Sequence, residues 1–190
     1  MSTPQPPRER ILATAADLFY RQGLHAVGID QIVAESGVAK MTLYRHFPSK
    51  DALIAAYLER ANASFWRWLD GEVGAVAEPR AQLLAIFEAV ARLTTAPQCL
   101  GCAFQGTAAE FPALDHPGHQ VALAHKRAVL DRLRTLAEQA GLRDPEALAG
   151  HLLLLMDGAW VATRMFGPDN PARHVARAAA ALIEAHTDSG

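Results

Sequence analysis

Cysteine is scarce in this sequence. Its 190 residues include only two, Cys99 and Cys102, which are too few for a disulfide framework. Their CxxC spacing suits a thiol redox pair or half of a zinc site. No second CxxC and no suitably spaced histidine pair completes a zinc site, and no βαβ pattern indicates a thioredoxin fold. The sequence therefore predicts no bound metal, and a cysteine-based redox sensor stays open as an alternative.

Long hydrophobic runs are also missing. The longest apolar run, near Leu152 to Met156, is far shorter than the roughly 20 residues that a membrane-spanning helix needs. The first ten residues, MSTPQPPRER, have no apolar core of the kind found in secretory signals. We therefore expect a cytoplasmic protein with no membrane partner.

The common catalytic motifs are absent as well. The sequence has no P-loop, GxGxxG, HExxH or GxSxG motif. Asp115, His116 and His119 could together hold a divalent metal, but they span a Pro-Gly loop, which favours a solvated loop instead. We predict that the protein is not an enzyme and carries no cofactor.

Net charge is small, at a formal −2, which taken alone argues against a nucleic-acid partner. The charges are unevenly distributed, however. Residues 1–60 hold seven Lys and Arg against six Asp and Glu, whereas the remaining residues hold eleven against fourteen. Between Ser36 and Lys50 there are three basic residues and no acidic one. Positive charge is therefore concentrated locally, and local charge is what meets phosphate groups.

The stretch 29–51 has the pattern of two short helices joined by a tight turn and followed by the start of a third. Ile32 contributes to the apolar stripe of the first helix. Gly37 can supply the positive φ that the turn needs, and Gly23 is predicted to end the preceding helix in the αL conformation. In the second helix, Leu43 and Phe47 lie four residues apart and point inward together. The pattern predicts a helix-turn-helix.

The opposite side of the second helix is free for recognition. At 100° per residue, Met41 and Arg45 project most directly outward, with Thr42 and Tyr44 on the flanks. A hydroxyl, a phenol and a guanidinium, with Lys40 nearby, suit a DNA major groove. Because one such head makes few phosphate contacts, useful affinity requires a dimer.

The run GVAKMTLYRHFPSKDAL, residues 37–53, resembles the signature of the TetR family of transcriptional regulators. The resemblance covers roughly the first sixty residues. It implies that the second motif helix enters the major groove, that Tyr44 and Lys50 contact phosphates, and that His46 contacts a phosphate or packs between helices. It also implies base-edge candidates on the same helix, which are Lys40, Met41, Thr42 and Arg45.

Three positions depart from the family pattern. Ala39 stands where a Ser or Thr commonly caps the recognition helix. Because alanine has no side-chain hydroxyl, this cap should be weaker by roughly 1 kcal/mol. Met41 replaces a frequent Gly or Pro, and Val33 replaces a usual Ala. The fold is expected to survive all three, but the operator sequence does not follow from them.

Helical periodicity continues along the rest of the chain. We predict an all-α protein of about nine helices, with a three-helix head joined by a long helix to a larger helical body. Ser49 is expected to cap the helix after the motif, which should run to about Asp70. The final helix is expected to open at Pro171. The expected domains are 1–50 for DNA binding and 51–190 for ligand binding and dimerisation.

The body supplies candidates for a ligand pocket and a dimer interface. Apolar sites with a few polar groups are the general form of small-molecule pockets, although aromatics at helical spacing are more often plain core. The pocket candidates are Trp66, Phe87, Phe104, Phe111, His151, Met156, Asp157 and Trp160. The last two helices are apolar and rich in small residues, which predicts a four-helix homodimer interface through Leu152, Leu155, Ala159, Val175, Ala179, Leu182 and Ile183.

The leading prediction is a ligand-responsive regulator, repressing rather than activating, that binds palindromic double-stranded DNA as a homodimer. A small-molecule effector of unknown identity would favour a head spacing that no longer fits the operator. A DNA-binding protein without an effector and a redox protein built on the CxxC remain as alternatives.

Overall fold

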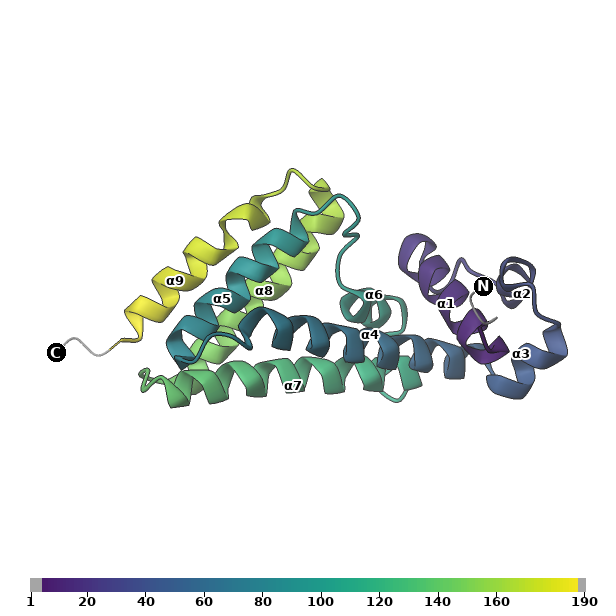
Figure 1. Cartoon of the computed structure of the whole chain (residues 1–190), viewed down its shortest axis with the longest axis horizontal. Helices are drawn as coiled ribbons and strands as arrows, with labels where there is room; N and C mark the ends of the chain where they lie inside the picture. The colour runs from purple at the N-terminus through teal and green to yellow at the C-terminus, as the bar shows by residue number, and fades with distance from the viewer. Residues whose placement is uncertain (1–4, 188–190) are drawn as a thin grey trace. The chain divides into compact units, whose positions relative to one another are not determined.

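The computed structural model of the chain describes residues 5–187, and all secondary structure in that range is helical (Figure 1). It contains nine α-helices and one short 3₁₀ helix. In chain order they are α1 (Pro7–Gln22), α2 (Ile29–Ser36), α3 (Lys40–His46), α4 (Lys50–Val73), α5 (Pro79–Thr94), α6 (Ala103–Glu110), α7 (Pro117–Gln139), α8 (Pro145–Phe166), η1 (Pro171–His174) and α9 (Val175–Ala185). The prediction of an all-α fold is confirmed.

The helices form two compact units. The first takes the described residues up to Ala63 together with Ala103–Ala124. The second takes Ser64–Cys102 and the described residues from His125 onward. The three-helix head is therefore joined, within its own unit, by the first part of α4, by α6 and by the start of α7. The expected functional division at residue 50 stays a prediction.

In the first unit, α1, α2 and α3 pack around apolar side chains spaced three and four residues apart. Ile11 and Ala15 of α1, Ile32 of α2 and Leu43 of α3 are each fully buried. Gly37 ends α2 with φ 64° and ψ 30°, the αL conformation predicted for the turn. Gly23 ends α1 at φ 90° and ψ 161°, which is outside the αL region that was predicted. At Gly23 the chain leaves the helix extended, and the next two amides turn to a partner outside α1.

The long helix α4 begins where it was expected and ends later. Ser49 Oγ accepts a hydrogen bond of 3.0 Å from the amide of Ala52, which is an N-terminal cap. The helix continues past Asp70 to Val73. At the start of α7, a Cβ added to Gly118 would lie 2.9 Å from Ile54 Cγ2 of α4. Only glycine allows this close approach of α7 to α4.

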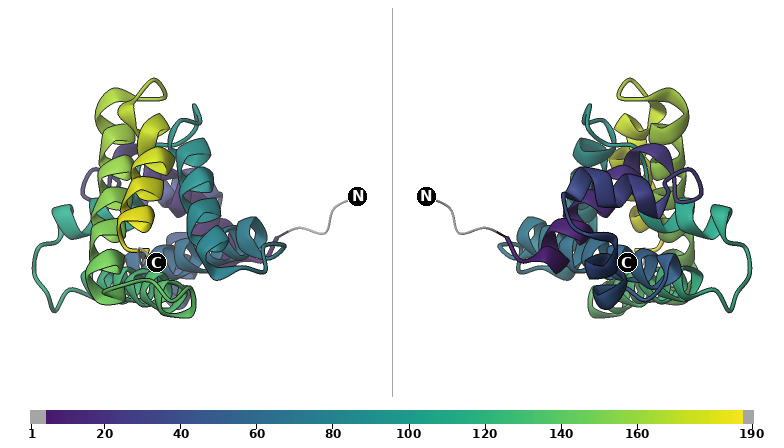
Figure 2. Two further views of the ribbon diagram at one scale, coloured as in Figure 1. Left: turned by 90° about the vertical axis from the view of Figure 1, so that its left-hand side faces the viewer. Right: turned by 90° about the vertical axis from the view of Figure 1, so that its right-hand side faces the viewer.

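In the second unit, α5, α8 and α9 lie side by side, as the views in Figures 1 and 2 agree. Their shared core contains large side chains with almost no exposed surface, including Phe87, Leu83, Leu148 and Leu152. The C-terminal part of α4 and most of α7 add Leu69 and Leu133 to the same core. Burial of these apolar side chains is the main source of stability.

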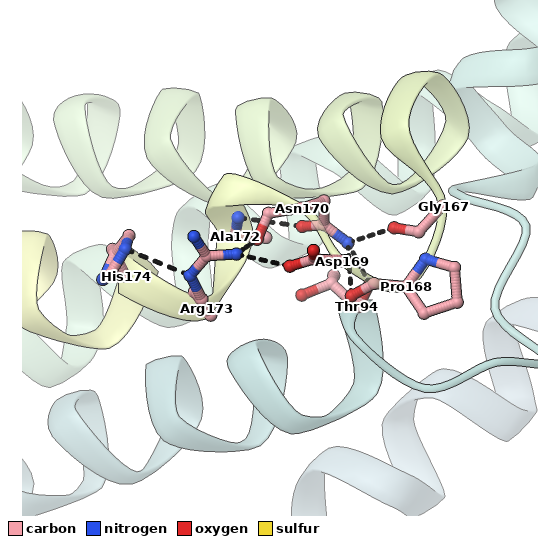
Figure 3. Close-up of polar contacts among 8 residues, drawn as sticks. All are labelled: Thr94, Gly167, Pro168, Asp169, Asn170, Ala172, Arg173 and His174. Atoms are coloured by element: carbon pink, nitrogen blue, oxygen red, sulfur yellow. Dashed lines mark hydrogen bonds and ion pairs between the residues drawn. The ribbon is translucent and has the colours of Figure 1, made fainter.

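A buried polar network closes the corner between α8 and α9 (Figure 3). Asn170 is 1% exposed, and its Nδ2 donates to the carbonyl oxygen of Thr94 over 2.9 Å and to that of Gly167 over 2.5 Å. Its Oδ1 accepts from the amide of Ala172 over 2.8 Å. Thr163 Oγ1 also donates to the Thr94 carbonyl, over 2.8 Å. The network joins the end of α5 to the end of α8 and caps η1.

The same corner explains a difference from the predicted final helix. Pro171 does open a helix, but its first four residues are the 3₁₀ turn η1, and α9 proper begins at Val175. Asn170 caps that 3₁₀ turn through its side chain, which holds the first amides in the tighter geometry.

Candidate nucleic-acid interface

The two sides of α3 differ in the way that the sequence predicted. Leu43 is fully buried and Phe47 is 2% exposed, so they anchor the helix to the head. Met41 is 80% exposed and Tyr44 is 41% exposed, on the other side. Met41, Thr42, Tyr44 and Arg45 together line a shallow open hollow in the surface. Because the buried side of α3 holds it to the head, its exposed side, which carries apolar, hydroxyl and charged groups, can enter a DNA groove without loss of core contacts.

Lys40, at the start of α3, forms an ion pair with Asp30 of α2. Its Nζ lies 2.6 Å from Asp30 Oδ1, and both side chains are more than half exposed. The hydrogen bond and the negative charge of Asp30 raise the pKa of Lys40 above its usual value. Lys40 is therefore firmly cationic but already has an anionic neighbour, with which a DNA phosphate or base would compete.

Arg8 and Arg10 of α1 both contact the helix-turn-helix motif. Arg10 Nη2 donates to the carbonyl oxygen of Gly37 over 2.9 Å, which ties α1 to the tight turn. The Arg8 guanidinium lies 5.2 Å from the centre of the Phe47 ring, in a cation–π arrangement. Both side chains support the helix-turn-helix while keeping positive charge beside it.

The remaining candidates lie at the two ends of α3. Ala39 occupies the N-cap with no side-chain hydrogen bond, as its identity implies. His46 is half-buried in the last turn, and Arg45 beside it is exposed. Lys50 Nζ makes a long contact of 3.5 Å with the carbonyl oxygen of His25, which leaves most of its hydrogen-bonding capacity available.

The eight pocket candidates are spread over both units. Phe104 and Phe111 belong to the first unit, and the other six belong to the second. Phe87, Phe104, Met156 and Trp160 are buried, Trp66, Phe111 and Asp157 are half-buried, and His151 is exposed. Asp157 forms an ion pair with Lys126, which gives this partly buried charge the partner it needs.

Trp66 belongs to an aromatic cluster that the sequence did not single out. The ring of Phe65 lies 5.3 Å from that of Trp66, 5.5 Å from that of Trp68 and 4.8 Å from that of His125. Burial, with a smaller contribution from the charge of Lys126, lowers the pKa of His125 to about 4. His125 is therefore neutral at pH 7, and its ring packs against Phe65 as an uncharged aromatic group.

This lowered pKa predicts a pH-dependent stability. The unfolded chain takes up a proton on His125 near pH 6.5, whereas the folded protein resists it until about pH 4. Folding stability is therefore lost as pH falls between these values. From pH 7 to pH 5 we expect His125 to account for a loss of about 1–2 kcal/mol, measured by urea unfolding.

Replacing His125 with Phe keeps an aromatic ring beside Phe65 and removes the titrating group. The variant should lose less stability than the wild type between pH 7 and pH 5, by the amount assigned to His125. Equal losses in both proteins would contradict the assignment.

Five of the seven residues predicted for the dimer interface point into the core of their own chain. These five are Leu152, Ala159, Val175, Ala179 and Ile183, each no more than 4% exposed. Leu155 and Leu182 are half-buried. The apolar side chains that α8 leaves uncovered are others, namely Leu154, Val161, Met165 and Phe166, which are 46–72% exposed. Periodicity identified α8 as an apolar helix but did not separate its buried side from its exposed side, and the dimer interface itself stays a prediction.

The cysteines and the histidine loop have structural surroundings. Cys99 is buried and Cys102 is half-buried. His119 Nδ1 donates to the carbonyl oxygen of Phe111 over 2.8 Å, and His116 Nδ1 accepts from the amide of Gly118 over 3.1 Å. Across residues 5–187 no cluster of His, Cys, Asp and Glu has a metal-binding arrangement, and no helix is both long and apolar enough to cross a bilayer.

Comparisons with known proteins all find transcriptional regulators. The model of the bacterial regulatory proteins of the tetR family matches residues 11–57. YxaF of Bacillus subtilis, an uncharacterized HTH-type transcriptional regulator, is 57% identical over 42 residues, which are 22% of each chain. The alignments with this and the next curated relative cover 22% and 49% of those proteins' own length.

Two solved structures extend the likeness over the whole chain. A transcriptional regulator from Saccharomonospora viridis, in complex with choline, is 24% identical over 93% of this chain and 95% of that one, with a TM-score of 0.72, and shows the fold alone. SCO4454, a TetR-family transcriptional regulator from Streptomyces coelicolor, is 35% identical over 96% of both chains, with a TM-score of 0.91. Together with the buried and exposed sides of α3, these matches show that the chain belongs to the TetR family of transcriptional regulators.

Proposed function

We propose that this DNA-binding regulator is a ligand-responsive repressor that acts in the cytoplasm as a homodimer on palindromic operator DNA. The observation that carries the proposal is the two-sided α3, with Leu43 buried and Met41 80% exposed. A small molecule bound in the body would shift the population toward a head spacing that fits the operator poorly. Residues 1–50 would read DNA, and 51–190 would hold the effector and the second subunit.

In the proposed complex, α3 lies in the major groove. Tyr44 and Lys50 contact phosphates, since both end in donors that need no particular base. Thr42 and Arg45 meet base edges from the exposed side of α3, and Arg45 is suited to guanine. Met41 offers an apolar contact, of the kind a thymine methyl accepts. His46 stays close to the head and supports the helix end or donates to a phosphate.

Lys40 has a different position in this scheme. Its ion pair with Asp30 must be exchanged for a DNA contact, so its net contribution is smaller than that of an unpaired lysine. We therefore assign Lys40 to a base edge or phosphate within reach of α2, with less weight than Arg45.

The proposed dimer uses the uncovered side of α8. Leu154 and Val161 are seven residues apart and Met165 follows four later, so the three form one stripe along the helix. An exposed apolar stripe of this kind is costly in water and marks an interaction surface. Exposed small residues of α9, such as Ala178 and Ala181, would allow close approach of a second pair of helices. The half-buried Leu155 and Leu182 would complete its edges.

The proposed effector site is in the second unit, near Trp66, His125 and the Lys126–Asp157 pair. The half-buried Trp66 ring and the buried His125 ring, beside an ion pair, combine apolar surface with polar groups that can be exchanged for a ligand. The choline complex of the Saccharomonospora viridis regulator supports the idea that this fold takes small molecules. Phe87, Met156 and Trp160 would then act as the buried back of the site, and His151 would lie outside it.

The alternatives have narrower support. Full burial of Phe87 and near-full burial of Met156 favour a body that is simply packed, in a regulator that has no effector. The partial exposure of Cys102 is the observation that favours a redox sensor. Replacing both cysteines with Ser separates the redox case, because oxidant-sensitive DNA binding would then disappear.

Single substitutions on α3 and α4 test the assigned roles. Tyr44→Ala and Lys50→Ala should each weaken binding about equally on specific and unrelated DNA, and Lys50→Ala should also reduce the salt dependence by about one ion. Arg45→Ala should cost about 1–3 kcal/mol on the operator and relax preference at one base pair. Gel shifts with the DNA upstream of its own gene and with unrelated DNA measure both effects.

The matched control is Arg127→Ala in α7, an exposed residue outside the head whose loss changes the charge equally. It should bind DNA as the wild type does. If Arg45→Ala weakened all sequences alike while Lys50→Ala changed the preferred sequence, the phosphate and base roles would be reversed.

A further inference from the structure

Glu110, the last residue of α6, uses its side chain to hold the connection between α1 and α2. Its Oε1 accepts from the amide of Leu24 over 3.0 Å, and its Oε2 accepts from the amide of His25 over 2.7 Å. Both amides follow the end of α1, where no helical carbonyl is available to them. One carboxylate thus satisfies two donors from a segment 85 residues earlier in the chain.

The close fit at this point includes Gly23. A Cβ added there would lie 3.3 Å from Glu110 Oε1, and the positive φ of Gly23 is already unfavourable for other residues. The extended exit of the chain from α1, which differs from the predicted αL ending, directs the next two amides at the carboxylate. The backbone conformation at Gly23 therefore directs the amides of Leu24 and His25 toward the Glu110 carboxylate.

His25 strengthens the contact and links it to a DNA-binding candidate. Its Nε2 donates to the Glu110 carbonyl oxygen over 2.9 Å, and its ring lies 4.4 Å from that of Phe111. The Phe111 ring stacks in turn on His116 at 4.1 Å and an interplanar angle of 9°. On the other side, the carbonyl oxygen of His25 receives Lys50 Nζ at 3.5 Å. Glu110, His25 and Lys50 are thus consecutive in one chain of contacts.

We propose that Glu110 is a positioning residue for DNA recognition, which fixes the α1–α2 connection and through His25 the placement of the Lys50 ammonium. The proposal rests on the function proposed above, in which Lys50 contacts a phosphate. Without the carboxylate, two amides lose their partner and the His25 backbone is free to move. Lys50 then meets its phosphate from a less defined position, and part of the binding free energy is used to order it.

The sign of the effect separates positioning from simple electrostatics. Removing a negative charge from a DNA-binding unit should by itself strengthen binding to a polyanion. Positioning predicts the opposite. Glu110→Ala should weaken operator binding about tenfold, equivalent to about 1.4 kcal/mol. Glu59→Ala, an exposed acid on α4 of the same unit, sets the charge baseline and should bind at least as tightly as the wild type.

The test is a double-mutant cycle with Lys50→Ala, read by fluorescence anisotropy well below the melting temperature. If Glu110 acts through Lys50, Glu110→Ala should cost about tenfold in the wild type and about twofold or less when Lys50 is already Ala. An additive loss would mean general destabilisation and overturn the proposal. Glu110→Gln, which keeps one acceptor oxygen, should fall between Ala and the wild type, and it serves if Glu110→Ala folds poorly.

Amide hydrogen exchange gives a readout that does not depend on DNA. The amides of Leu24 and His25 should exchange at least about tenfold faster in Glu110→Ala, while Glu59→Ala leaves them unchanged. Faster exchange with unchanged DNA affinity would overturn the positioning role alone. If the wild type bound no DNA, the proposed function would fail and the positioning role with it, and the exchange rates would still report whether the carboxylate holds these amides.

Discussion

Replacing Val161 with Glu is expected to convert the proposed dimer to a monomer and to weaken binding to a palindromic operator by at least about a hundredfold. Val161 is 46% exposed in the middle of the apolar stripe of α8, between Leu154 and Met165. In the dimer that stripe would be covered, and an unpaired carboxylate there would lose its hydration without gaining a partner.

The large effect on DNA follows from bivalency. Two linked heads bind successive half-sites with an effective concentration far above that of free protein, and a monomer loses this advantage. Binding to an isolated half-site should change little, because the head is untouched. Light scattering after size exclusion gives the oligomeric state, and anisotropy with full and half operators gives the affinities.

Leu114→Glu is the matched control for this substitution. Leu114 is 67% exposed in the connection between α6 and α7, so the same change of an apolar side chain to an acid is made away from α8. It should leave mass and affinity unchanged. A Val161→Glu protein that remained a dimer with full operator affinity would show that the stripe is not the interface.

Replacing Asn170 with Ala is expected to be the most destabilising single polar substitution in the second unit, at about 2–4 kcal/mol. Asn170 is 1% exposed and serves as donor to Thr94 and Gly167 and as acceptor for Ala172 (Figure 3). Alanine leaves the buried amide of Ala172 without its acceptor. It also removes the hydrogen bonds that Asn170 Nδ2 donates to the carbonyl oxygens of Thr94 and Gly167. Urea unfolding followed by circular dichroism measures the loss.

The neighbouring Asp169 provides the comparison. Its side chain is 98% exposed and pairs with Arg173 over 2.7 Å, so Asp169→Ala should cost less than about 1 kcal/mol. Asn170→Asp should be as damaging as Ala, because a carboxylate cannot donate to the Thr94 carbonyl. An Asn170→Ala protein as stable as Asp169→Ala would mean that the network carries little of the stability of this corner.

Local patterns in the sequence were enough to predict the helices and the buried and exposed sides of α3. Leu43 and Phe47 lie four apart and are buried, and Met41, two positions before Leu43, is exposed, because helical periodicity and the apolar effect act over one or two turns. Glycines and prolines at helix boundaries act equally locally: Gly37 ends α2, and Pro145 opens α8. The family consists of transcriptional regulators, which confirms the prediction of a protein that is not an enzyme.

Features that depend on distant segments could not be predicted in the same way. Glu110 is an unremarkable helix-terminal acid until the fold brings it to Leu24 and His25. Asn170 reads as a loop residue, and only its contact with Thr94 shows that it is buried. In α8, apolar residues occur all around the helix, so periodicity did not distinguish Leu152, which faces the core, from Leu154, which is exposed.

The most direct test of the account is an anisotropy titration of the intact protein with the DNA upstream of its own gene, over a series of salt concentrations and with hydroxyl-radical footprints of the complex. We expect salt-sensitive binding and two protected half-sites about one helical turn apart, with protection lost when Tyr44 and Lys50 are replaced. Absence of any salt-sensitive binding, or a complex unaffected by changes on α3, would contradict the claim that this helix reads DNA.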